Sequence, residues 1–117
     1  MDSCAQGEIW AVRLDPAEGA ELKKTRPCMI ISRSKVNQYL ETVTVIPFTS
    51  GTKHQTILHI DVASSSANGL GEDSYLKVHQ MRTVSKTRLQ QKLGNLEHRY
   101  FPIIRASMDE YFWGGIL

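Results

Sequence analysis

The sequence lacks several features that would place it in a specialised class of proteins. Of its 117 residues only Cys4 and Cys28 are cysteines, too few and too far apart for a disulfide scaffold or a zinc site. No apolar run approaches the roughly 20 residues that span a bilayer, and the first residues show no basic and then apolar signal sequence. The net charge of +2 excludes a histone-like or strongly acidic protein. We therefore expect a cytoplasmic protein with reduced thiols.

Familiar catalytic and nucleotide-binding motifs are missing as well. The chain contains no GxxxxGK[ST] or GxGxxG loop of the kind that binds nucleotide phosphates. It also contains no GxSxG motif, which would carry a nucleophilic serine. Its four histidines are scattered without metal-ligand spacing, and its carboxylates form no cluster of the kind that holds Mg²⁺. We therefore expect neither a metal ion nor a cofactor. The sequence is compatible with metal-free chemistry on a phosphate, or with binding alone.

What the sequence does contain is ordinary globular composition, with 41% hydrophobic and 22% charged residues. This composition and length predict one compact domain over residues 1–117. The apolar runs are short and rich in β-branched residues, and polar turns separate them. Five to seven short strands at close spacing are typical of a small barrel or sandwich. The expected strands are Ile9–Leu14, Cys28–Ile31, Val43–Phe48, Ile57–Val62, one or two within Ser74–Val84, and more weakly Arg88–Leu93.

The hydrophobic pattern changes to a helical period near the C-terminus. Pro102 is tolerated only in the first turn of a helix, so the helix should begin near Glu97 to Arg99. Gly114 and Gly115 should end it. We expect one amphipathic helix lying on the barrel, and thus a mainly β fold with α (α+β). Its barrel-facing residues should be Phe101, Ile104, Met108, Tyr111 and Phe112.

Positive charge is unevenly distributed along this nearly neutral chain. From Leu22 to Leu40 there are five cations and no carboxylate, and from Lys77 to Arg99 there are six cations and one carboxylate. A positive face suited to phosphate is one interpretation. Solvated loop charges are the simpler one, because Lys and Arg are mostly exposed in any protein.

Six short segments occur in an informative order along the chain. They are Gly7-Glu8-Ile9-Trp10, Asp15-Pro16, Gly19-Ala20-Glu21, Arg26-Pro27, Ile46-Pro47-Phe48-Thr49-Ser50 and Gln80-Met81-Arg82-Thr83-Val84. Together they resemble the MazF/PemK family of toxin endoribonucleases, over a core of about residues 7–117. The resemblance implies an SH3-like small β-barrel with a C-terminal amphipathic helix, the fold that CcdB-type toxins share. It also implies a homodimer and a cognate antitoxin as partner.

The resemblance implies cleavage of single-stranded RNA at short sequences without a metal ion, which inhibits translation and growth. The ribose 2′-hydroxyl attacks the adjacent phosphate and leaves a 2′,3′-cyclic phosphate (or 3′-phosphate) and a 5′-hydroxyl. Arg26 and Thr49 match the catalytic pair of the family. A guanidinium presents forked donors to the phosphate oxygens as their charge grows, and a threonine hydroxyl adds another donor. A guanidinium gives up its proton very reluctantly, so Arg26 is a poor base, and electrostatic stabilisation ranks before proton transfer.

Taken alone, these two residues would have plainer interpretations, a loop arginine before a strand and a turn-capping threonine. The resemblance also implies RNA contacts. Glu21 matches a family glutamate in the loop after the first strand, and Gln80 matches a glutamine near the RNA groove. Ser50 and Lys53 are expected in the loop beside Thr49, within reach of phosphates or bases.

Two further residues leave alternatives open, His79 directly before the last segment and Arg82 within it. His79 stands where the family usually has an acid, in a position that reaches a base in relatives. In place of the usual acid, an imidazole at this position would make RNA affinity depend on pH. Arg82 matches a family arginine, and either contacts RNA or braces a dimer or loop by ion pairing.

Two other functions remain open for such a chain. A CcdB-like toxin inhibits gyrase by contact through C-terminal aromatic residues, and this chain ends in the aromatic run Tyr111-Phe112-Trp113. We interpret that run as the packed face and end of the C-terminal helix. The other alternative is a non-catalytic barrel that binds RNA or protein and cleaves nothing.

Overall fold

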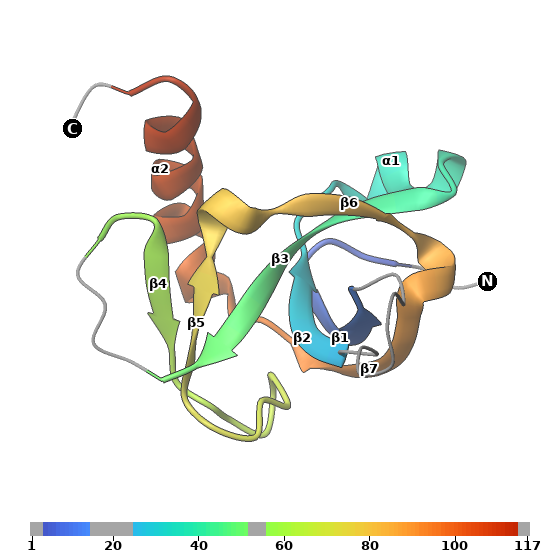
Figure 1. Ribbon diagram of the computed structural model, residues 1–117, viewed down its shortest axis with the longest axis horizontal. Helices are drawn as coiled ribbons and strands as arrows, with labels where there is room; N and C mark the ends of the chain where they lie inside the picture. The colour runs from blue at the N-terminus through green and yellow to red at the C-terminus, as the bar shows by residue number, and fades with distance from the viewer. Residues whose placement is uncertain (1–3, 15–24, 52–55, 115–117) are drawn as a thin grey trace, which may run out of the picture.

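The structure, a computed structural model, describes residues 4–14, 25–51 and 56–114. It contains seven antiparallel strands and two α-helices, with short 3₁₀ turns between some of them (Figure 1). No helix in these described ranges is long and apolar enough to cross a membrane. The strands are β1 (Glu8–Arg13), β2 (Thr25–Ile30), β3 (Thr42–Ser50), β4 (His59–Val62), β5 (Ser74–Lys77), β6 (Arg82–Ser85) and β7 (Leu89–Asn95).

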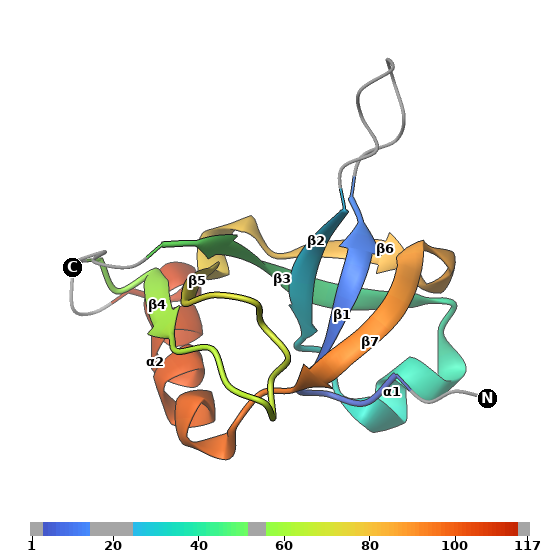
Figure 2. The ribbon, with the colours of Figure 1, turned by 90° about the horizontal axis from the view of Figure 1, so that it is seen from below.

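Five of these strands curl into the small barrel that the sequence predicts. They pair in the order β7-β1-β2-β3-β6, and the 3₁₀ turn η2 (Lys86–Arg88) connects β6 directly to β7 (Figure 2). A cluster of small and β-branched side chains fills the barrel, and its members are Cys4, Val12, Leu14, Cys28, Ile30, Val43, Val45 and Val84.

The long strand β3 links this barrel to a second layer. Its first part pairs with β2 and β6, whereas its end pairs with β5, which in turn pairs with β4. Because strand residues alternate between faces, Val43 and Val45 point into the barrel while Ile46 and Phe48 enter a second core under the C-terminal helix. Burial of both faces explains why this strand has a nearly continuous apolar sequence.

The C-terminal helix α2 (Phe101–Phe112) covers this second core. The 3₁₀ turn η3 (His98–Tyr100) precedes it, so the α-helix begins slightly later than predicted. Pro102 lies in the first turn, as expected. The chain leaves the helix at Gly114, whose φ of 79° is accessible to glycine at low cost.

The aromatic end of α2 contradicts the prediction that it packs on the barrel. Tyr111, Phe112 and Trp113 are 46%, 52% and 83% exposed. The buried positions in the last turns of α2 carry polar residues instead, Ser107 and Glu110. The Ser107 hydroxyl donates a 2.6 Å hydrogen bond to the Ile57 carbonyl oxygen.

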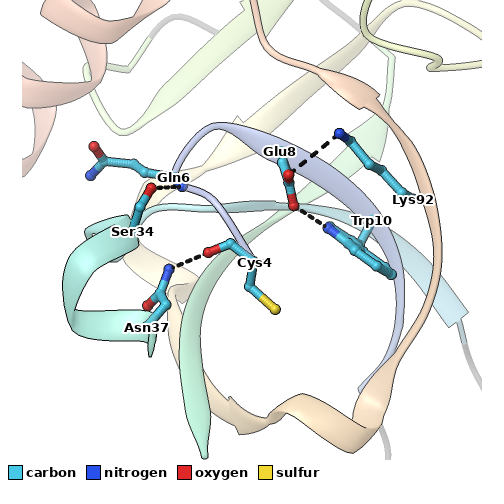
Figure 3. A network of polar contacts seen from close by, with 7 residues as sticks. All are labelled: Cys4, Gln6, Glu8, Trp10, Ser34, Asn37 and Lys92. Carbon is cyan, nitrogen blue, oxygen red and sulfur yellow. Dashed lines mark hydrogen bonds and ion pairs between the residues drawn. The ribbon is translucent and has the colours of Figure 1, made fainter. Parts of the chain in front are cut away.

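A short helix that the sequence pattern did not indicate, α1 (Ser34–Tyr39), lies between β2 and β3 in the chain. Its polar residues hold the N-terminal segment (Figure 3). The Asn37 side-chain amide donates to the Cys4 carbonyl oxygen at 2.7 Å, and the Gln6 backbone N–H donates to the Ser34 hydroxyl at 2.9 Å. With only six residues, α1 depends on these tertiary contacts, since isolated short helices are marginal in water.

The first segment of the family pattern has a structural role. Glu8 is 8% exposed. Its carboxylate accepts a 2.9 Å hydrogen bond from the Trp10 indole and forms a 3.3 Å ion pair with Lys92 of β7 (Figure 3). These contacts connect β1 to β7.

Candidate functional site

Arg26 and Thr49 lie within strands, and not in loops as the sequence suggested. β2 begins at Thr25 and β3 continues to Ser50, so each strand extends beyond its apolar run. The hydrogen-bonded pairing of β2 with β3 stops at Cys28 and Pro47. Neither Pro27 nor Pro47 has an N–H to donate, which explains why the pairing ends here. Beyond this point β3 diverges from β2 toward β5 (Figure 1). We call the resulting gap between residues 25–27 and 48–50 the β2–β3 split.

Arg26 and Thr49 lie on the same face of these two strands. Arg26 is two residues from Cys28, and Thr49 is two residues from Pro47, the partner of Cys28. Side chains two apart on a strand share a face, and directly paired residues do so too. Arg26 is exposed and Thr49 is half-buried. The two side chains predicted to act together therefore lie on the same face at one end of the barrel, on either side of the β2–β3 split.

Arg82 joins them from the start of β6. It pairs with Val45 of β3, and so lies on the same face as Cys28 and Arg26. Burial raises the pKa of the Cys28 thiol to about 12, while the positive charges of Arg82 and Arg26 act in the opposite direction. Both guanidinium groups are thus within electrostatic reach of one sulfur atom. We refer to the surface formed by Arg26, Thr49 and Arg82 as the Arg26 face.

Neither arginine is neutralised within the described part of the chain. Arg26 and Arg82 are both exposed, and no described carboxylate forms an ion pair with either of them. The bracing ion pair considered for Arg82 therefore has no counterpart among these residues. Two guanidinium groups and a hydroxyl, contributed by three strands, are suited to an anion such as a phosphate.

The far side of Thr49 carries an aromatic group that sequence reasoning missed. Thr49 pairs with Tyr75 of β5. The Tyr75 ring is 5.2 Å from that of His59 on β4, and the His59 ring is 5.4 Å from that of His79. Histidines that look scattered in the sequence thus come together. The sequence predicted strands within 57–62 and 74–84, but not the pairing that aligns these rings.

The 3₁₀ turn η1 (Val78–Gln80) positions the two predicted residues of the last segment. It separates β5 from β6, so Ser74–Val84 forms two strands. His79 is half-buried against His59, whereas Gln80 is exposed. His79 is therefore next to the aromatic group and Gln80 faces solvent.

Ser50 lies on the opposite face from Thr49, because it follows Thr49 directly along β3. It lines a cavity of about 380 Å³ at the β2–β3 split. Glu72, another residue that the sequence did not single out, lines the same cavity. The lining residues are Thr25, Arg26, Pro27, Phe48, Ser50, Leu70, Gly71, Glu72 and Ser74. The predicted contacts Glu21 and Lys53 lie outside the described residues.

The loop of residues 63–73, which we call the Glu72 loop, is fastened to the body of the protein by Glu97. The Ser65 hydroxyl donates to a Glu97 carboxylate oxygen at 2.6 Å, and the Asn68 amide donates to the other at 3.1 Å. Burial by itself would raise the pKa of Glu97, but these hydrogen bonds, one from its own backbone and the charge of Arg99 together lower it. The ionised carboxylate is therefore the form that holds the loop.

Possible metal ligands do not gather in the described ranges: no three His, Cys, Asp or Glu side chains there come together in a group that could hold an ion. The donors of the Arg26 face are instead groups that bind anions directly.

Comparisons with known proteins give a consistent result. Residues 5–112 match a family described as "PemK-like, MazF-like toxin of type II toxin-antitoxin system". Over 105 residues the chain is 33% identical to "Endoribonuclease MazF" of Staphylococcus epidermidis, which covers 89% of this chain and 87% of that protein.

Solved structures show the same fold. "Mycobacterium tuberculosis toxin MazF-mt6" has a TM-score of 0.73 and 25% identity, over 90% of this chain and 95% of that one. An endoribonuclease in complex with its cognate antitoxin, from a mycobacterial species, has a TM-score of 0.76 at 16% identity, over 97% and 98% of the two chains. The predicted mainly β fold with a C-terminal helix is confirmed.

Proposed function

The chain belongs to the PemK-like, MazF-like toxins of type II toxin-antitoxin systems, and from this premise we propose that it cleaves single-stranded RNA at specific sequences without a metal ion. The observation that carries the proposal is the Arg26 face. It presents Arg26, Thr49 and Arg82 together, and the described residues supply no carboxylate that neutralises the arginines.

In the proposed reaction the ribose 2′-hydroxyl gives its proton to solvent water and its oxygen attacks the adjacent phosphorus. The new O2′–P bond forms as the P–O5′ bond breaks, and the leaving O5′ takes up a proton from solvent. The products are a 2′,3′-cyclic phosphate, open to hydrolysis to a 3′-phosphate, and a 5′-hydroxyl. Negative charge grows on the non-bridging oxygens. The Arg26 guanidinium and the Thr49 hydroxyl stabilise that charge and orient the phosphate. Arg82, on the same face, holds a neighbouring phosphate.

Fixed donors of this kind contribute strongly to rate because they act where charge develops. Loss of one such donor typically lowers the rate by about 10²–10³. We therefore expect Arg26→Ala and Thr49→Ala each to reduce cleavage by that order. Arg105→Ala serves as a control, since Arg105 is exposed on α2 and lies outside the Arg26 face.

The test is incubation of the purified protein with a long single-stranded RNA in EDTA, with mapping of the 5′ ends of the fragments. Discrete cuts by the wild type and the Arg105 variant, and strongly reduced cutting by the other two, are the expected result. A requirement for added Mg²⁺, or full activity of Arg26→Ala, would contradict the mechanism.

We also propose that a cognate antitoxin binds this chain and competes with RNA, and that the chain forms a homodimer. The antitoxin complex of the mycobacterial relative supports the first point. Exposed cationic side chains such as Arg26 and Arg82 would steer an acidic partner to the same surface. Unchanged cleavage with the antitoxin bound would contradict this competition.

The exposed aromatic end of α2 favours a second candidate function. Tyr111, Phe112 and Trp113 are available for contact, which is the feature expected of a CcdB-like gyrase inhibitor. A supercoiling assay with purified gyrase distinguishes the two functions, because unchanged supercoiling removes this second candidate.

A further inference from the structure

The cavity at the β2–β3 split differs in character from the Arg26 face. Pro27 and Phe48 form apolar walls, and Leu70 of the Glu72 loop adds a third. Phe48 and Leu70 are 1% and 6% exposed, so these walls are part of the packed core and are firmly held. The volume of about 380 Å³ lies in the range of roughly 300–1,000 Å³ typical of small-ligand sites. Apolar walls of this kind suit the flat faces of a planar ring.

Glu72 adds a charged group to the edge of the cavity, and hydrogen bonds hold its backbone and that of the next residue. The Glu72 carbonyl oxygen accepts a 2.9 Å hydrogen bond from the Ser74 hydroxyl. The next residue, Asp73, accepts backbone hydrogen bonds from Ser64 through its side chain at 2.9 Å and from Gly51 through its carbonyl at 3.0 Å.

The carboxylate of Glu72 has no such partner. It is exposed, and no described residue donates a hydrogen bond to it or pairs with its charge. Beside it, a Cβ added at Gly71 would meet no atom within 4 Å, so this side of the cavity is open. Glu72 is thus an acceptor at the accessible edge of a cavity that has both apolar and polar walls.

Arg26 connects the cavity to the site of the proposed reaction. It lies on the Arg26 face with Thr49, and it also lines the cavity. When Arg26 binds a phosphate, the cavity beside it is therefore large enough for the base of an adjacent nucleotide. In single-stranded RNA, recognition of sequence commonly uses bases that are splayed out, stacked and read at their edges.

We infer that this cavity binds a nucleobase next to the phosphate held by Arg26, and that Glu72 selects a base with an exocyclic amino group. The inference rests on the proposed function, since it assigns one of the base positions of the RNA substrate. A carboxylate only accepts hydrogen bonds when ionised, and it pairs with the amino group of cytosine, adenine or guanine.

Uracil is the base that this arrangement rejects. It has no exocyclic amino group, and its N3–H lies between two carbonyl oxygens. The lone pairs of these two oxygens would repel the lone pairs of the carboxylate. A good base contact is worth about 10- to 100-fold in discrimination. The expected preference is therefore for any amino-bearing base over uracil at one nucleotide beside the cut.

The experiment uses short RNA oligonucleotides built around a mapped cleavage site, with each of the four bases placed in turn at the nucleotides flanking the cut. Wild-type protein should cleave the uracil substrate about 10- to 100-fold more slowly at one flanking position. Glu72→Gln should reduce this discrimination to a few-fold, because a glutamine amide offers a donor to the uracil carbonyl as well as an acceptor.

Glu41→Gln is the matched control. It removes the same charge from an exposed glutamate at the opposite end of β3, away from the cavity. This variant should keep the wild-type preference. Equal cleavage of all four substrates by the wild type at both flanks would overturn the inference, and so would an unchanged preference in Glu72→Gln.

A binding measurement separates failure of the inference from failure of the proposed function. If the wild type cleaves no RNA, the proposed function fails, and the cavity is tested by NMR titration with cytidine and uridine monophosphates. Larger shifts of the Gly71 and Ser74 amides with the cytidine nucleotide, lost in Glu72→Gln, support the base site. Equal shifts with the two nucleotides, or none, overturn it.

Discussion

Asn68 holds the Glu72 loop in place, and its removal provides a quantitative test of this arrangement. Its side chain is fully buried, with 0% exposure. The amide donates to the Ala63 carbonyl oxygen at 2.9 Å and to Glu97 at 3.1 Å. The amide oxygen accepts from the backbone N–H groups of Ser65 and Leu70, both at 3.0 Å. Asn68→Ala removes all four interactions and leaves buried polar groups without partners.

The expected loss of stability follows from these bonds. A hydrogen bond contributes about 0.5–1.5 kcal/mol net, and one to a charged group more. Four of them amount to about 2–6 kcal/mol, of which water entering the loop recovers a part. We expect Asn68→Ala to lower the free energy of unfolding by about 3 kcal/mol. At about 4 °C per kcal/mol for a domain of this size, the melting temperature should fall by about 12 °C.

Urea denaturation and thermal melting followed by circular dichroism measure this change. Asn95→Ala is the control, because Asn95 is exposed on β7, and an exposed substitution usually changes stability by less than about 0.5 kcal/mol. A loss below about 1 kcal/mol in Asn68→Ala would refute the idea that these buried hydrogen bonds determine the position of the loop.

Two further predictions concern the same region. Gly94→Ala should destabilise the fold by about 1–3 kcal/mol in urea denaturation, because the new Cβ would lie 2.4 Å from the Ala67 carbonyl oxygen, a backbone atom of the Glu72 loop. Gly71→Ala, where a Cβ meets nothing within 4 Å, should be nearly neutral, and equal losses in the two variants would contradict this account. The lowered pKa of Glu97 should also make stability depend on pH. Since the folded pKa lies below the unfolded one, its contribution is complete above the unfolded pKa of about 4.3 and is lost as pH falls through the folded pKa. The acid loss of stability should therefore be smaller in Glu97→Gln, and identical pH profiles would show that Glu97 contributes nothing.

The chain sequence predicted most of the secondary structure because the signals are local. β-branched runs indicated the strands, and Pro102 and Gly114 marked the ends of the helical region through their own backbone preferences. The helix α1 was missed because it has no apolar period and depends on contacts with Cys4 and Gln6 at the N-terminal segment. The exposed aromatic end of α2 was also mispredicted, since helical spacing shows which side chains share a face but not how far the covered surface extends.

Within the candidate site, the sequence by itself determined residue types: an Arg-Pro pair, a Pro-Phe-Thr-Ser segment and a Gln-Met-Arg segment in family order. Only the tertiary structure decided that Arg26, Thr49 and Arg82 share a face, because strand pairing relates positions far apart in the chain. It likewise decided the cavity with Glu72 and the ring contacts of His59, which have no local sequence signal. The physical reason is that residue types and the spacings between them can be read along the chain. Which residues become neighbours in space depends on which strands pair and on where that pairing stops.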